Sequence, residues 1–273
     1  MKKLLSLLFF FPLLVNAQKN IVCLNIQPNI NSNIAFSGFT KYINILDCFR
    51  IYAESNISDE KILHAAAVAA ELLDNNEDGI VDDPLIEMQL QNTQAFTPIF
   101  SYEGSIAENL LFNNYEGEGV SAVLYNSEID PTQTGHWGND ATVEEVIHTI
   151  NHVGHTNIYP NAFGLQPNSS LMSTAMDEAR GGQFLNVPSS YPISAWYHYD
   201  DQTCDYECMA IEYMYWSIVS NMGILDDIQT AQGIANEWEA YNATLLQNKD
   251  VLMYDLITNS QYNLPLLAPD GNY

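Results

Sequence analysis

Basic residues are scarce in this chain of 273 residues. It contains 8 Lys and Arg but 34 Asp and Glu, so its formal net charge is −26 at pH 7. A charge of this sign repels nucleic acids and anionic membrane surfaces, and it attracts cations. We therefore expect no nucleic-acid partner, and we expect cations to be favoured as partners. The alternative is that the acidic surface serves solubility alone.

Long apolar runs are also missing, apart from one at the start of the chain. Two lysines precede an apolar run over residues 4–15, and residues 15–17 fit a signal-peptidase site. The run is too short to span a bilayer comfortably, so residues 1–17 are predicted to be a secretory signal peptide. The rest of the chain, residues 18–273, is predicted to be a single globular domain without a membrane span, secreted or periplasmic.

Cysteine is rare, with four residues in the chain. In an oxidising compartment four cysteines are expected to form two disulfides, for which three pairings are possible. Proximity in the sequence favours Cys23 with Cys48 and Cys204 with Cys208. The spacings match no common zinc finger, which makes a cysteine-based zinc site a weaker interpretation.

Several motifs of well-known enzyme classes are absent. The chain has no G-x-S-x-G nucleophile elbow, no phosphate-binding P-loop and no dinucleotide-binding glycine motif. A di-iron carboxylate site needs two Glu-x-x-His motifs, and only Glu145 and His148 fit that spacing. The chemistry that remains lies in an acidic loop and in a helix rich in Glu and His.

Local patterns predict an α+β fold that is predominantly helical, with a small sheet in the first half of the chain. The composition, with 47% hydrophobic and 11% aromatic residues, is sufficient for a sizeable core. Alternation predicts the strands, and capping residues before amphipathic segments predict the helices. The predicted strands cover residues 21–26, 42–52 and 119–129, and the predicted helices cover residues 59–73, 142–155, 171–180, 206–222, 226–241 and 243–258, with a further helix that begins at residue 84.

The segment from Asp74 to Asp83 resembles the calcium-binding loop of EF-hand proteins, within a helix–loop–helix over residues 59–95. Such loops place oxygen ligands at alternating positions around a glycine that allows a sharp turn, here Gly79. The family has a bidentate Glu at position 12, where this chain has Leu85, so the resemblance implies that Asp83 or Glu87 replaces it and that affinity is weak, near the millimolar range. The alternative is a polar turn between two helices. The calcium ligands predicted from the resemblance are Asp74, Asn76, Asp78, the carbonyl of Ile80, Asp82 and Asp83.

Half of the six histidines lie between residues 142 and 155. On an α-helix, His148 and His152 lie one turn apart on the same face, together with Glu144 and Glu145. Two histidines at this spacing can bind one transition metal ion with two nitrogens. The alternative is that acids in the first turn and histidines in the last turn only complement the helix dipole.

This helix and the strand before it resemble the active-site region of zincin metallopeptidases, which places the metal-site region at residues 119–182. The resemblance implies that His148 and His152 bind zinc. The general base of that family directly follows the first His, where this chain has Thr149, and in the inverted pattern it directly precedes the second, where this chain has Asn151. The third ligand or a displaced base must therefore come from other acids. The candidates are Glu145 or Glu144 on the same helix and Asp177 or Glu178 downstream, followed by Glu212 and His198.

Two functions are consistent with these patterns. The first is an exported, zinc-dependent, metallopeptidase-like hydrolase, with Glu145 as the catalytic acid or base and with calcium stabilising the fold. Its substrate is expected to be a peptide or a polysaccharide, and aromatic residues between Tyr191 and Trp216 can either line its cleft or form core. The second is a non-catalytic, calcium-stabilised extracellular binding or structural protein. In both interpretations, residues 204–258 form the C-terminal helices of the domain.

Overall fold

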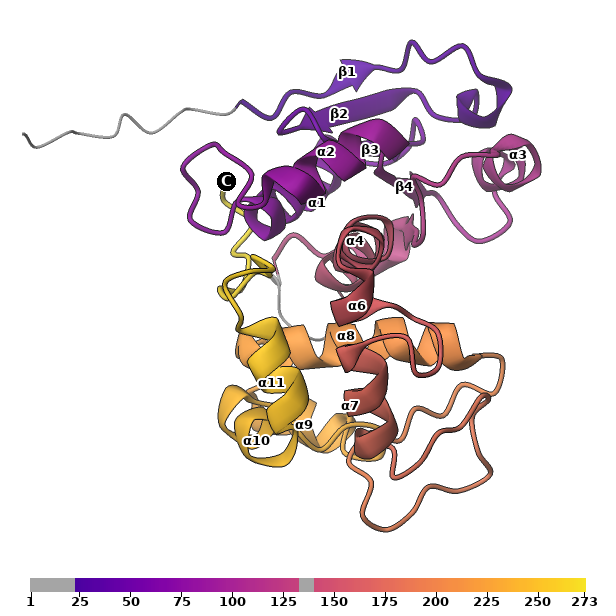
Figure 1. Cartoon of the computed structure of the whole chain (residues 1–273). Coiled ribbons are helices and arrows are strands. Elements are labelled where there is room, and N and C mark those ends of the chain that lie inside the picture. The colour runs from indigo at the N-terminus through magenta and orange to yellow at the C-terminus, as the bar shows by residue number, and fades with distance from the viewer. Residues whose placement is uncertain (1–22, 133–139) are drawn as a thin grey trace, which may run out of the picture.

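The computed structural model describes residues 23–132 and 140–273, so the predicted signal peptide over residues 1–17 lies outside the described residues. The fold is α+β, with one five-stranded sheet whose strands follow the chain order (Figure 1). The first three strands pair antiparallel, whereas β3, β4 and β5 pair parallel. The strands are β1 (Gln27–Pro28), β2 (Lys41–Ile45), β3 (Phe49–Ala53), β4 (Phe96–Phe100) and β5 (Leu124–Tyr125).

The helices between and after the strands differ in length. In Figure 1 the sheet lies at the top, α4 lies near the centre, and α6 to α11 form the lower half. The longer helices are α1 (Asp59–Leu73), α2 (Pro84–Thr93), α3 (Ile106–Asn114), α4 (Thr142–Ile150), α7 (Leu171–Ala179) and α8 (Tyr206–Asn221). Shorter ones are α5 (Thr156–Ile158), α6 (Pro160–Phe163), α9 (Ile228–Gly233), α10 (Ala243–Lys249) and α11 (Val251–Ile257), with 3-10 turns η1 (Ile34–Phe36) and η2 (Asn126–Glu128) and a π-helical segment η3 (Asn151–His155).

Capping side chains set the starts of several helices, as predicted. Ser58 accepts a hydrogen bond from the backbone N–H of Lys61 at the start of α1. At the start of α2, where a proline occupies the first turn, Asp83 accepts hydrogen bonds from the backbone N–H groups of Leu85 and Ile86. Ser170 caps α7 in the same way, through a bond from the N–H of Ser173. Because an N-cap satisfies backbone N–H groups that have no partner within the helix, these boundaries can be recognised locally.

The segment predicted as one strand over residues 42–52 is a hairpin, β2 and β3. Leu46 and Asp47 adopt left-handed conformations, with φ of 46° and 55°, and they reverse the chain direction. The turn places Cys48 in the core, where burial raises the pKa of its thiol to about 12. Cys23 is exposed, and the two cysteines are not bonded. The predicted Cys23–Cys48 disulfide is therefore wrong, because the turn directs one thiol inward while the other remains at the surface.

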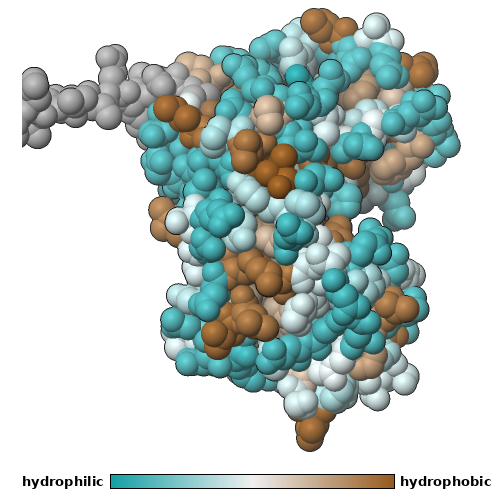
Figure 2. Space-filling view, in the orientation of Figure 1, coloured by the Kyte–Doolittle hydropathy of each residue, from teal (hydrophilic) through white to brown (hydrophobic). Residues whose placement is uncertain are grey.

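Two hydrophobic clusters lie within the described chain. The smaller one is aromatic, and in it Phe36 contacts Tyr52 and Phe96 with ring centroids 4.7 and 5.1 Å apart. The larger one joins the sheet to most of the helices and contains Tyr197, Tyr213 and Trp238. Buried aromatics of the second half of the chain are thus mainly core. Hydrophobic residues on the face drawn in Figure 2 form separate groups on a largely hydrophilic surface.

The helices of the described chain do not include one with the length and apolar composition that a membrane crossing needs. The longest, α8, has 16 residues.

The end of the chain is bonded back to α1 and to the acidic loop that follows it. The side-chain oxygen of Asn75 accepts hydrogen bonds from the backbone N–H groups of Leu266 and Leu267, at 2.9 and 2.8 Å. The carboxylate of Glu71 accepts from the N–H groups of Asp270 and Gly271. This arrangement buries Glu71, and burial raises the pKa of its carboxyl from 4.5 to about 7.

This shift predicts a pH dependence of stability that Glu71→Gln removes. Between pH 4.5 and about 7 the unfolded chain releases the proton of Glu71 while the folded chain keeps it. The contribution of Glu71 to the free energy of unfolding therefore falls as the pH rises. We expect the variant to gain about 2 kcal/mol relative to the wild type over this range, which allows for solvent screening. Urea unfolding at a series of pH values in EGTA measures the difference, and parallel profiles would contradict it.

Candidate metal centre

The first turn of α4 carries two acids whose positions depend on how the helix begins. Asp140, just before the helix, accepts hydrogen bonds from the backbone N–H and the hydroxyl of Thr142, at 3.1 and 2.5 Å. The apolar face of the helix is buried against α1. Glu144 and Glu145 therefore project from the opposite side, as the helical pattern predicts, and His148 follows one turn later.

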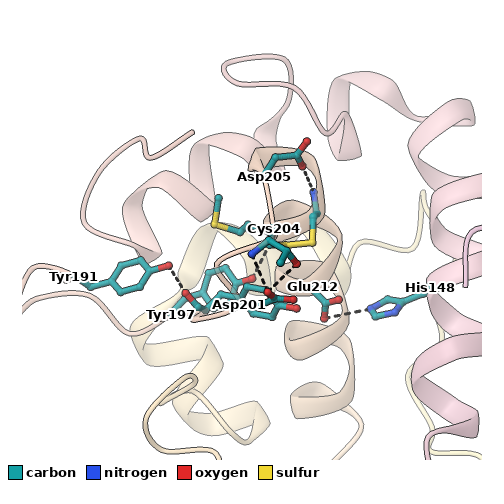
Figure 3. The surroundings of a disulfide bond; sticks show 11 residues. His148, Tyr191, Tyr197, Asp201, Cys204, Asp205 and Glu212 are labelled. Atoms are coloured by element: carbon teal, nitrogen blue, oxygen red, sulfur yellow. Dashed lines mark hydrogen bonds and ion pairs between the residues drawn. A yellow bond between two sulfur atoms is a disulfide. The ribbon is translucent and has the colours of Figure 1, made fainter. Parts of the chain in front are cut away.

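Glu144 and His148 of α4 converge with Glu212 of α8. Ligand atoms of the three residues all lie within 4.8 Å of one another. The Nε2 atom of His148 is 3.5 Å from a carboxylate oxygen of Glu212, and the two side chains are 9% and 16% exposed. Figure 3 shows Glu212 and His148 facing each other from the two helices. Within the described residues this is the one group of three or more His, Cys, Asp and Glu side chains that converges in this way.

The imidazole of His148 has a buried nitrogen without a hydrogen-bond partner. Its Nε2 atom is inaccessible, and the contact with Glu212 does not meet the geometry of a hydrogen bond. A buried polar atom in this state is unusual in folded proteins and is normally satisfied by a water molecule or an ion. A cation between the three side chains would satisfy it.

Burial shapes the protonation of all three groups. It lowers the pKa of His148 and raises the pKa of Glu144, and it raises the pKa of Glu212 to about 7. Each shift disfavours the charged form, because the side chains leave water without a full counter-charge. A bound dication supplies that counter-charge and favours two carboxylates and a neutral imidazole, which are the metal-binding forms.

Two tyrosines lie beside the carboxylates of the group. Tyr215 is near Glu144 and Tyr199 is near Glu212, and the charge of each carboxylate helps to raise the pKa of its tyrosine. The ring of Tyr215 also packs edge-on against His148, with centroids 5.2 Å apart. Partners of this kind fix the orientation of metal ligands. Part of the aromatic cluster predicted as core or cleft is thus the support of the candidate metal centre.

A cavity of about 650 Å³ opens beside the three residues. Its walls come from residues 120–123, from α4 and from the first half of α8. Glu145 lines it next to the candidate ligands, and burial together with the charge of Glu144 raises the pKa of Glu145 to about 9. An acid beside a potential metal in an accessible cavity is placed to exchange protons with a water molecule there.

His152 lies outside the converging group, contrary to the predicted pair with His148. The helix changes from α to π geometry at Asn151, in the segment η3. A π-helix has more residues per turn, so the side chains that follow are rotated away from their α-helical positions. His152 lines the cavity without joining the three ligands. His155 is buried against Tyr159 and Phe163, and burial lowers its pKa to about 4.

The two downstream acids predicted as ligands also lie elsewhere. Asp177 of α7 accepts hydrogen bonds from Gln183 and Tyr206, at 2.8 and 3.0 Å, and Glu178 is exposed. Neither belongs to the converging group, because α7 presents them away from α4. The third residue of the converging group is Glu212, which the sequence places among the weaker candidates. An acid within the largely buried helix α8 is the signal that points to it.

The disulfide between Cys204 and Cys208 is present, as predicted (Figure 3). It links the end of the preceding loop to the first turn of α8. Cys208 and Glu212 are one helical turn apart, and both line the cavity. The disulfide therefore stabilises the end of the helix that supplies the third candidate ligand.

The predicted calcium loop joins α1 to α2. Gly79 has a φ of 86°, which agrees with the sharp turn expected at this position. The buried carboxylate of Asp74 accepts hydrogen bonds from the N–H groups of Asp78 and Gly79, at 3.1 and 2.7 Å. The oxygens of Asp82 face Asn75 and Asn76 instead of a common centre. The carboxylates of the loop do not form a converging group within the described chain.

Asp83 is positioned as a helix cap and not as a calcium ligand. One of its oxygens accepts from the N–H groups of Leu85 and Ile86, and the other accepts from the hydroxyl of Tyr159 at 2.6 Å. Both oxygens are therefore directed at α2 and Tyr159. The other three predicted calcium ligands are Asn76, Asp78 and Ile80. All three residues are exposed at the surface of the loop.

Comparison of the chain with models of protein families, with curated proteins and with solved structures finds no match in any of the three. The function must therefore be argued from the geometry of the site itself.

Proposed function

We propose that Glu144, His148 and Glu212 bind a transition metal ion, and that the ion is zinc. The observation that carries this proposal is the convergence of three ligand atoms within 4.8 Å, one of them a buried imidazole nitrogen that has no hydrogen-bond partner. A tetrahedral zinc ion with bonds near 2.1 Å separates its ligand atoms by about 3.4 Å, close to the 3.5 Å between His148 and Glu212. Nitrogen and carboxylate oxygen ligands are typical of zinc.

Three protein ligands and an accessible cavity are typical of a catalytic site rather than a structural one. Structural zinc sites have four protein ligands, whereas catalytic sites leave a position for water or substrate. A zinc ion held by these three residues would supply a Lewis acid to the cavity. Glu145 lines the wall beside the candidate ligands, and we expect it to accept a proton from water in the cavity once the charge of a bound dication lowers its pKa from about 9. The resulting activity is a metal-dependent hydrolysis.

We propose a peptide as the substrate and an extracellular or periplasmic place of action. A peptide substrate is proposed because α4 resembles the zincin helix, although its Glu and His ligands are placed differently from those of that family. Export accounts for the disulfide at Cys204 and Cys208, which an oxidising compartment favours, and for the signal-like start of the chain.

The test is hydrolysis of a fluorogenic peptide library by the chain that begins at Gln18, after removal of metals and reconstitution with zinc. We expect cleavage with zinc and none after treatment with a chelator. Purified protein that holds one zinc per chain but cleaves neither peptides nor oligosaccharides would contradict a hydrolase. That result would support the non-catalytic alternative, which the lack of Glu at Thr149 and Asn151 favours.

We also propose that the loop from Asp74 to Asp82 binds calcium weakly and stabilises the junction of α1 and α2. The glycine turn and the N–H groups held by Asp74 support it. Because the side chains of Asp78 and Asp82 must rotate toward a common centre, the affinity is expected to be near the millimolar range of extracellular calcium sites.

This predicts a calcium-dependent melting temperature. With a dissociation constant of about 1 mM, calcium at about 10 mM stabilises the fold by about 1.4 kcal/mol, or about 3–5 °C. Differential scanning calorimetry with calcium and with EGTA measures the shift. Asp78→Ala is expected to abolish it, whereas the control Glu60→Gln, which removes an exposed acid in the first turn of α1, should preserve it. A shift of equal size in both variants would rule out the loop as the site.

A further inference from the structure

The cavity beside the candidate metal centre is lined, as far as the structure describes it, by acids that have no basic counterpart. Five carboxylates line it, and its lining within the described chain includes neither Lys nor Arg. The five acids are Glu144, Glu145, Asp205, Glu207 and Glu212. The basic side chains of the described residues lie at other places, where several have partners of their own: Lys41 with Asp59, Lys61 with the carbonyl of Asn126, Lys249 with Glu239, Arg180 with the carbonyl of Phe184, and Arg50 on β3.

A metal ion in the proposed site does not balance this charge. A dication offsets the two ligand carboxylates and leaves Glu145 as the proton acceptor. Asp205 and Glu207, both exposed at the start of α8, remain as additional negative charges in the lining of the cavity. A substrate that brings no positive charge would bind next to uncompensated carboxylates, which is unfavourable in a partly enclosed site.

The positions of these two acids are fixed by the local structure. Asp205 caps α8 and accepts a hydrogen bond from the N–H of Cys208 at 3.0 Å. Glu207 accepts a hydrogen bond from the side chain of Gln166. The disulfide between Cys204 and Cys208 spans the same turn (Figure 3). Acids held in place by such bonds lose little conformational freedom on binding, which favours recognition of a specific group.

We propose that the cavity selects peptides with a lysine or arginine side chain beside the bond to be cleaved, and that Asp205 and Glu207 bind this cation. The inference rests on the proposed function for the hydrolytic step, but the recognition itself needs only the cavity and its charges. The apolar wall formed by Val120, Ala122 and Ile211 accommodates the aliphatic part of such a side chain.

A purely structural role for the two acids is the competing explanation. Acidic residues are favoured in the first turn of any helix because they complement its dipole. The first turn of α1 provides the matched case, since it carries Asp59 and Glu60 at the surface, away from the cavity. Removal of either pair changes the net charge by the same amount, so a comparison of the two separates local recognition from the field of the whole acidic chain.

The experiment measures binding of three peptides by isothermal titration at physiological salt. The peptides are Gly/Ser/Ala octamers that differ only in a central Lys, Gln or Glu. We expect the Lys peptide to bind about 10-fold more tightly than the Gln peptide and the Glu peptide to bind most weakly. The double variant Asp205→Asn, Glu207→Gln, in which Asn keeps the helix cap, should reduce the Lys preference to about 2-fold. The double variant Asp59→Asn, Glu60→Gln should leave it unchanged.

Equal binding of the three peptides to the wild type would overturn the proposal, and so would an equal loss of preference in both double variants. Binding is measured with and without zinc, and cleavage is followed separately. A Lys preference that persists in protein unable to cleave any peptide would refute the proposed hydrolysis while supporting the cation site. Cleavage of all three peptides at similar kcat/KM would support the hydrolase and refute the selectivity.

Discussion

His148→Ala is expected to weaken zinc binding by more than about 100-fold, because changes in outer-shell partners alone cost about 10-fold to 100-fold. The substitution removes the nitrogen ligand at the centre of the group and leaves two carboxylates near each other. Competition with a chromophoric chelator measures the dissociation constants of the wild type and the variant. Circular dichroism confirms that the variant remains folded.

His152→Ala is the matched control for this prediction. It removes a second imidazole from the same helical segment and the same cavity, but that imidazole lies outside the converging group. We expect its zinc affinity to stay within a few-fold of the wild type. Equal losses in the two variants would instead favour the two-histidine site that α-helical spacing predicts, and they would contradict the rotated position of His152 after the start of η3.

Glu145→Gln is expected to lower kcat by about 100-fold to 10,000-fold, the usual contribution of a general base. The amide is close to isosteric with the carboxylate but cannot accept a proton from water. Because Glu145 lines the cavity without belonging to the three ligands, the variant should still bind one zinc per chain. Steady-state kinetics on the best library peptide, together with metal analysis of the same sample, separate these effects.

Glu178→Gln provides the control for that experiment. Glu178 is an exposed acid of α7 that the sequence also places among the candidate ligands, and the structure removes it from the site. Its substitution should change neither kcat nor zinc content. If Glu145→Gln keeps full activity, or if Glu178→Gln loses it, the assignment of the base to Glu145 is wrong.

Local features of the fold could be predicted from the sequence, because their causes are local. Ser58, Asp83 and Ser170 cap helices through bonds to residues two or three positions later, and those helices begin where predicted. The Cys204–Cys208 disulfide joins residues of one turn and was also predicted. The left-handed residues at Leu46 and Asp47 have no glycine to mark them, so the hairpin was predicted as one strand.

The candidate site was predicted only in part, because its geometry depends on one long-range approach and on one local departure from α-helical geometry. His148 and Glu144 lie on one face of α4, which helical periodicity identifies. Glu212 reaches them from α8, and no local pattern links residues so far apart in the sequence. The α-to-π transition at Asn151 breaks the periodicity on which the second histidine ligand was predicted.

The central claim is that acids from two helices and one histidine bind a single transition metal ion. The most direct measurement is the zinc-to-protein ratio, by mass spectrometry of the metal, for the wild type, Glu212→Gln and Asp177→Asn after dialysis against dilute zinc. We predict one zinc per chain in the wild type and in Asp177→Asn, and a large loss in Glu212→Gln. A wild type that retains no zinc, or a Glu212→Gln variant that retains it fully, would contradict the site.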